Sequence, residues 1–153
     1  MDIPGIGSFI LESVPSGPAL WSLARPVASA LYAEPVPVNV VLESTESPDD
    51  VDLALVTAVL SSLDDHIGRA LTFVHGRLLV DPSSFGLTSA SPYVTVDDVP
   101  VDLPQVNFYV GDEWILHFQR GRPPICEPYG MGVVFSRHNP VRIDDLTEVD
   151  PID

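Results

Sequence analysis

The chain has 153 residues, and its 22 Asp and Glu residues against seven Arg and no Lys give a formal net charge of −15. Hydrophobic residues make up 45% of the chain, which is enough to bury a core and unlike a disordered acidic protein. Nucleic acids and anionic membrane surfaces would repel this charge, so we exclude both as direct partners and expect a basic partner. This length predicts one domain over residues 1–153.

The compartment follows from the cysteine count and from the N-terminal segment. Cys126 is the single cysteine and cannot form an internal disulfide, which is typical of a reducing compartment. The N-terminus has no basic start followed by an apolar run, and no segment reaches the ~20 apolar residues of a membrane-spanning helix. We therefore expect a cytoplasmic protein.

The first half of the chain predicts strands followed by helices. Apolar and β-branched runs predict strands at 8–13 and 36–42, whereas 19–28 is ambiguous because Pro26 interrupts it. Ser47 is a suitable cap for a helix that begins at Pro48 and has two carboxylates in its first turn, and Ser62 is a suitable cap for a second helix. Apolar residues at helical spacing predict helices over about 48–60 and 63–80.

The second half of the chain predicts two hairpins. A loop over 83–103, with a short strand at 93–96, precedes strict alternation at 106–110 and 114–118, which predicts a hairpin turned at Gly111-Asp112. A second hairpin joins 132–136 to 141–143 through His138-Asn139-Pro140, and the acidic tail 144–153 is expected to fray. The order of the elements predicts an α+β fold: an antiparallel sheet of about five to seven strands with both helices packed on one face.

The sequence carries no strong catalytic, metal-binding or cofactor-binding motif. Metal-site patterns such as HExxH, the GxSxG nucleophile motif and a P-loop are all missing, so we expect neither an enzyme nor a metal or cofactor. A less favoured alternative is a small enzyme that uses Cys126 with His117, or a carboxylate pair. The arginines at 120, 122, 137 and 142 gather in the last third, where we expect local pairing with Glu127, Asp144 or Asp145.

The uneven spread of acidic residues is the most informative pattern. Clusters of like charge repel one another and contribute little to folding, so they indicate either a solubilising surface or a field that captures a basic partner. Aromatic side chains beside them are suited to anchor such an interface. The residues that we expect to bind a partner are Asp49, Asp50, Asp52, Asp64, Asp65, Asp97, Asp98, Asp112, Glu113, Tyr93 and Tyr109.

A small, acidic, α+β chain of this kind resembles the immunity proteins of bacterial contact-dependent inhibition and polymorphic toxin systems. The detailed resemblance rests on the stretches FYVGDEWILHF, RPPICEPYGMGVVF and NPVRIDDLTEVD. It implies a partner, a cognate toxin domain that is often a basic nuclease, whose active site or substrate surface the protein occludes. The alternatives from other classes are a non-enzymatic adaptor and a nucleic-acid mimic that binds many nucleic-acid enzymes.

Overall fold

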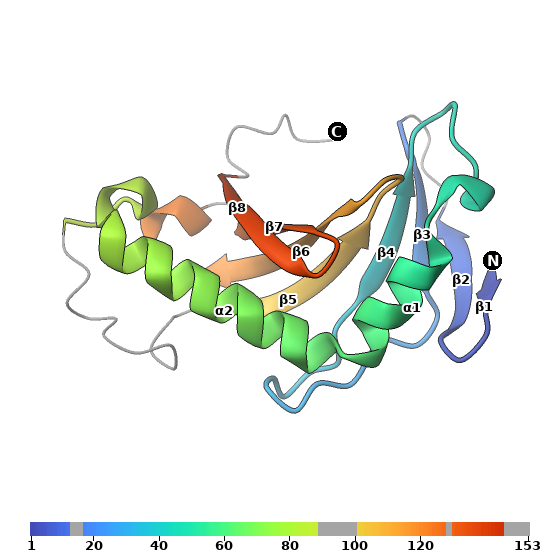
Figure 1. The fold of residues 1–153 in the computed structure, drawn as a ribbon, viewed down its shortest axis with the longest axis horizontal. Helices are drawn as coiled ribbons and strands as arrows, with labels where there is room; N and C mark the ends of the chain where they lie inside the picture. Colours follow the sequence, from blue (N-terminus) through green and yellow to red (C-terminus); the bar gives the residue numbers. More distant parts are fainter. Residues whose placement is uncertain (13–16, 89–100, 128–129, 146–153) are drawn as a thin grey trace.

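A mixed sheet organises the computed structural model, which describes residues 1–12, 17–88, 101–127 and 130–145 (Figure 1). Within these residues the sheet has eight strands, and their order across the sheet is their order along the chain. The strands are β1 (Asp2–Ile3), β2 (Gly7–Glu12), β3 (Ala19–Leu23), β4 (Val38–Leu42), β5 (Val101–Phe108), β6 (Glu113–Gly121), β7 (Met131–Ser136) and β8 (Asn139–Asp145).

Neighbouring strands are antiparallel except for β4 and β5, which run parallel with Val38 opposite Val106. A parallel pair needs a crossover connection, and here the helical segment between the two strands supplies it. The predicted α+β class is confirmed. The predicted number of about five to seven strands is too low for the eight described. The predicted antiparallel pairing holds for every neighbouring pair except β4 and β5, because the crossover returns the chain to start β5 in the direction of β4.

The helical segment begins differently from the prediction. Pro48–Asp50 form a separate 3-10 turn, η1, in which the Ser47 hydroxyl accepts from the Asp49 N–H and the Asp50 carboxylate accepts from the Ser47 N–H. Val51 is extended, and the first α-helix, α1 (Leu53–Ser61), begins after Asp52, whose carboxylate accepts from the Leu55 N–H at 3.0 Å. The predicted helix start at Pro48 is therefore wrong, because two capping signals in succession divide the segment.

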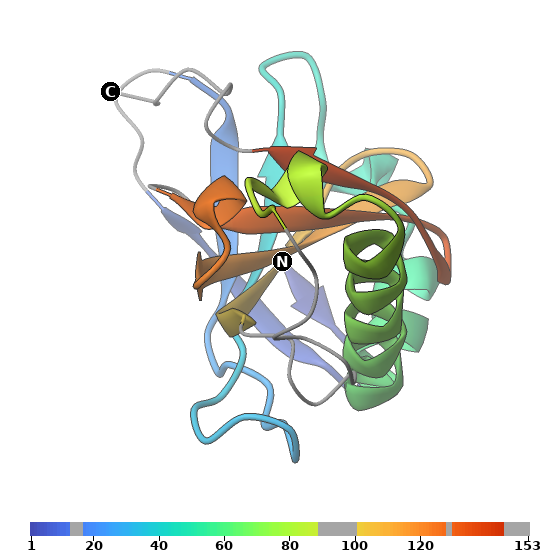
Figure 2. The ribbon, with the colours of Figure 1, turned by 90° about the vertical axis from the view of Figure 1, so that its left-hand side faces the viewer.

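The second helix, α2 (Leu63–Val80), confirms the predicted range 63–80. Ser62 stands at its N-cap position, but its side chain caps no backbone N–H and donates instead to the Ala58 carbonyl oxygen at 2.9 Å. Both helices lie on the same face of the sheet (Figures 1 and 2). They bury apolar stripes there, which consist of Leu55, Val56, Val59 and Leu60 in α1 and Leu63, Ile67, Ala70, Val74 and Leu78 in α2.

The core between the helices and the sheet is completed by the buried face of the central strands. In β6, Trp114, Leu116 and Phe118 are fully buried, while the residues between them are half-buried on the other face. Two short 3-10 turns, η2 (Pro82–Phe85) and η4 (Pro124–Cys126), add Phe85 and Cys126 to the same core. The alternation that predicted the hairpin of β5 and β6 is thus the alternation between core and outer face.

Three other expectations change with the structure. β5 begins at Val101, inside the segment expected to be a loop, and the expected strand at 93–96 lies outside the described residues. The second hairpin turns at Arg137-His138, because Ser136 pairs with Asn139, and Pro140 lies within β8 at the edge of the sheet, where a missing N–H is tolerated. Asp144 pairs with Gly132, so the first part of the expected tail is strand.

Candidate functional site

The parallel pair β4 and β5 places two acidic segments at one end of the sheet. The carboxyl ends of neighbouring parallel strands share an edge, so the connection that follows β4 and the turn that follows β5 emerge side by side (Figure 1). We call this surface the acidic end, and its members are Glu43, Glu46, Asp49, Asp50, Asp52, Asp112 and Glu113. The structure therefore brings together five of the predicted partner-binding carboxylates, which come from two segments that are distant in sequence.

Arg137, in the turn between β7 and β8, joins the two acidic segments. Its Nη1 atom lies 3.1 Å from Asp112 Oδ1 and 3.6 Å from Asp52 Oδ2. Its backbone N–H donates to the Asp112 carbonyl oxygen at 2.8 Å, and its own carbonyl oxygen accepts from Trp114 Nε1 at 2.6 Å. One arginine thus holds together carboxylates from α1 and from the β5–β6 turn.

A second arginine, Arg142 in β8, pairs with Glu113. Two guanidinium nitrogens of Arg142 lie 3.1 Å from the two Glu113 oxygens, and its Nε lies 3.3 Å from Asp144, one of the local partners expected from the sequence. The hydrogen bonds from Arg142 lower the pKa of Glu113. This carboxylate therefore remains charged at neutral pH but is neutralised within the chain.

Several carboxylates of the acidic end serve the local backbone. Glu46 accepts from the Glu43 N–H at 2.7 Å, and Asp50 and Asp52 cap helical turns. Among the described residues, the side chains of Glu43 and Asp49 have no hydrogen-bond or ion-pair partner. These two exposed charges are the part of the acidic end that the fold itself does not use.

The remaining predicted residues do not join the acidic end. At the start of α2, Asp64 accepts from the Ser29 hydroxyl at 2.6 Å and from the Ala30 N–H at 2.9 Å, and Asp65 pairs with Arg69 at 3.0 Å. These contacts fix the segment at 29–30 and the first turns of α2, and the role of both carboxylates in binding a partner stays a prediction. Tyr93, Asp97 and Asp98 lie outside the described residues.

Tyr109 is the predicted aromatic anchor that the structure describes. It follows β5 and is half-buried, and burial together with the nearby Asp144 raises the pKa of its hydroxyl. With Glu113 and Arg142 it lines a shallow hollow of about 390 Å³. Tyr109 therefore borders the acidic end beside Glu113.

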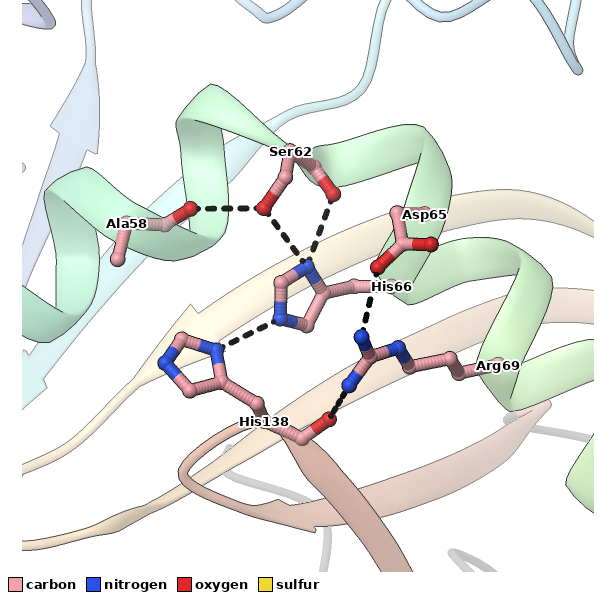
Figure 3. Close-up of polar contacts among 6 residues, drawn as sticks. All are labelled: Ala58, Ser62, Asp65, His66, Arg69 and His138. Carbon is pink, nitrogen blue, oxygen red and sulfur yellow. Dashed lines mark hydrogen bonds and ion pairs between the residues drawn. The ribbon is translucent and has the colours of Figure 1, made fainter.

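A contact between two histidines, which joins α2 to the β7–β8 turn, was not predicted from the sequence (Figure 3). His66 Nε2, in α2, lies 3.0 Å from His138 Nδ1, in the turn. Arg69 strengthens the same contact, because its Nη1 donates to the His138 carbonyl oxygen at 3.0 Å while its Nη2 pairs with Asp65. One signal was present in the sequence: His66 falls on the apolar stripe of α2, between Leu63 and Ile67, which predicts burial.

His66 is almost entirely buried, with 2% of its surface exposed. Its ring packs against Trp114, at 5.7 Å between centroids, and against Phe135, at 6.0 Å. Burial lowers the pKa of His66, and the Ser62 carbonyl, which hydrogen-bonds Nδ1, partly opposes this effect. The neutral ring is therefore the favoured form at neutral pH.

The alternative enzyme based on Cys126 and His117 finds little support in the geometry. Cys126 has 4% of its surface exposed and belongs to the hydrophobic core. His117 lies on β6 between Leu116 and Phe118, whose side chains point into that core, and so projects from the other face of the strand. A thiol packed in this way offers a substrate no direct approach.

The described part of the chain offers neither a metal-binding cluster nor a membrane-spanning helix. Within residues 1–12, 17–88, 101–127 and 130–145, no three His, Cys, Asp or Glu side chains gather in a way that could hold a metal ion. Neither α1 nor α2 has both the length and the apolar character needed to cross a bilayer. Comparison with protein-family models, with curated proteins and with solved structures finds no significant match.

Proposed function

We propose that this protein is a non-enzymatic inhibitor that binds a basic partner protein through its acidic end. The partner that we propose is a cognate bacterial toxin domain, of the nuclease class, whose active site or substrate surface the acidic end would occlude in the cytoplasm. The single observation that supports this proposal most is the convergence of the β4–α1 connection and the β5–β6 turn around Arg137.

The charge balance at the acidic end favours a cationic surface as the partner. Seven carboxylates share this end with Arg137 and Arg142, and these two arginines already contact Asp52, Asp112 and Glu113. Glu43 and Asp49 remain exposed without a cation among the described residues. Opposite charge on a partner would speed diffusional encounter, and it would compete with the substrate phosphates of a nuclease for the same basic surface.

The capping and pairing contacts also support a rigid, preformed surface. Asp50, Asp52 and Asp112 are held by backbone N–H groups or by Arg137, so a partner would meet carboxylates that are already positioned. A surface that is ordered before binding loses less side-chain entropy when the complex forms. This property suits tight inhibition of one cognate partner.

The test uses capture from a native lysate followed by measurement with the purified partner. The test variant, E43Q/D49N, removes the two carboxylates without a structural role, and the control variant, E34Q/E127Q, removes two exposed charges elsewhere. We expect wild type and control to capture the same basic protein. We expect the test variant to bind it with an association rate constant several-fold lower and with weaker salt dependence.

Two outcomes would contradict the proposal. Equal association rates for E43Q/D49N and E34Q/E127Q would mean that the acidic end takes no part in recognition. Capture of many unrelated nucleic-acid enzymes, in place of one partner, would indicate a nucleic-acid mimic. Unchanged circular dichroism of both variants would show that any difference arises from the surface charge.

A further inference from the structure

We propose that His66 and His138 form a proton-operated latch that holds the β7–β8 turn against α2 and thereby sets the arrangement of the acidic end. The inference rests on the proposed function only for its consequence for partner binding. The latch itself follows from the contacts of the two rings, which connect a buried helix position to an exposed hairpin turn (Figure 3).

The hydrogen bonds around His66 assign the protons of the neutral pair. The Ser62 carbonyl oxygen, 2.8 Å from His66 Nδ1, can only accept, so Nδ1 carries the proton. Neutral His66 then has a bare Nε2, which accepts from the Nδ1–H of His138 at 3.0 Å. Both rings are therefore protonated on Nδ1. Of their two unprotonated nitrogens, His66 Nε2 accepts from His138, and His138 Nε2 points away from the other residues drawn in Figure 3.

A proton on His138 Nε2 leaves the latch closed. His138 then still donates from Nδ1 to the neutral His66. A charged donor makes a stronger hydrogen bond than a neutral one, so this step strengthens the contact.

The second added proton opens the latch. Its remaining site is His66 Nε2, which faces the Nδ1–H of His138 at 3.0 Å, so two donors and two positive charges would meet. The charged groups that face His66 from α2 are Arg69, which disfavours the cation, and Asp65, which favours it but is paired with Arg69. The doubly protonated pair can therefore exist only if the two rings separate.

The β7–β8 turn transmits this separation to the acidic end. His138 follows Arg137 directly, and Arg137 holds Asp112 and Asp52 through its guanidinium and Asp112 through its backbone. A displaced turn would withdraw these contacts, and the two imidazolium charges would add positive charge beside the carboxylates. Binding of a basic partner would therefore weaken on acidification through the second step.

The test follows both rings and the neighbouring backbone by nuclear magnetic resonance between pH 8 and pH 4, with the full chain alone. We expect His66 to be protonated on Nδ1 at pH 8, and the amide shifts of Arg137 and Asp112 to move when His66 Nε2 takes up a proton. In H138N the amide nitrogen takes the place of Nδ1, and the amide can rotate to offer an oxygen when His66 is charged. The shifts of Arg137 and Asp112 should then lose most of their acid-dependent movement.

The control is H75N, which removes a histidine from α2 outside the pair and should leave the movement unchanged. The latch is disproved if His66 carries its proton on Nε2 at pH 8, or if H138N and wild type show the same movement at Arg137 and Asp112. Because no partner is present, this failure is distinguishable from a failure of E43Q/D49N to alter association.

Discussion

Arg137 contacts Asp112 twice, through its guanidinium at 3.1 Å and through its backbone N–H at 2.8 Å. The two residues belong to the turns of neighbouring hairpins, so the contact ties these turns together. Arg137 adopts a positive φ of 54°, a conformation that costs a residue with a Cβ atom about 1 kcal/mol. The contacts that Arg137 makes at the acidic end therefore offset the strain in its backbone.

Replacing Arg137 separates its strain from its charge. Asn tolerates the left-handed conformation better than Gln does, so we expect R137N to be more stable to urea than R137Q, by ~0.5–1 kcal/mol. Loss of the exposed ion pairs alone should cost R137Q less than about 1 kcal/mol. Equal urea midpoints for the two variants would show that the strain is negligible.

Variants of Asp52 separate its contribution to stability as a helix cap from its contribution to partner binding as a charge. Its carboxylate caps α1 through the Leu55 N–H and also lies 3.6 Å from Arg137. Asn is an equally good N-cap, so D52N should keep the free energy of unfolding within about 0.5 kcal/mol, whereas D52A should lose about 1 kcal/mol. Both should slow association with a basic partner equally. Should D52N lose as much stability as D52A, the cap would depend on the charge.

The pH dependence of stability should report the buried histidine. Burial lowers the pKa of His66 in the folded state, whereas in the unfolded chain it is about 6.5. Below that value the unfolded chain binds a proton that the folded chain does not, so the stability that His66 contributes is present above about pH 6.5 and is lost as the pH falls. The slope can reach ~1.4 kcal/mol per pH unit, the value for one proton.

The measurement is urea unfolding of wild type and H66Q at several pH values between 8 and 5. The amide of Gln can accept from His138 at the position of Nε2 but does not titrate. The difference between the two curves isolates His66 from the carboxylates, which titrate in both proteins. Parallel curves would show that His66 is charged equally easily in the folded and unfolded states.

The sequence predicted the elements whose own pattern is strong. The apolar stripe of α2 fixed its range at 63–80, and the alternation from Val106 to Phe118 identified the hairpin of β5 and β6. These patterns are local and reflect one buried face each. The parallel pairing of β4 with β5 depends on how the crossover packs, which no local pattern records. The helix start at Pro48 was wrong because Asp50 and Asp52 both act as caps.

The convergence of the predicted carboxylates could not be predicted from the sequence, for the same reason. Asp49, Asp50, Asp52, Asp112 and Glu113 share one end because β4 and β5 are parallel, a feature that the predicted sheet lacked. Asp64 and Asp65 follow the first acidic cluster along the chain. Their carboxylates, however, contact Ser29, Ala30 and Arg69 and do not belong to the acidic end. The contact between His66 and His138 joins residues 72 positions apart, and only the packed fold brings them together.

Trp114 supports the turn from inside the core, and its replacement should show how far the turn depends on that support. The side chain is fully buried, stacks on Phe135 at 4.2 Å between centroids, and donates to the Arg137 carbonyl oxygen at 2.6 Å. In W114F the smaller ring leaves a cavity and an unpaired carbonyl, which together should lower the free energy of unfolding by ~2–4 kcal/mol. The control is W21F, since Trp21 is half-buried in β3, and it should lose less than about 1.5 kcal/mol.

Hydrogen exchange at the Arg137 amide should rise in W114F beyond the change that global destabilisation explains, because the turn has lost its internal hydrogen bond. Similar losses in the two variants, with unchanged relative exchange at Arg137, would show that the indole contributes only its volume.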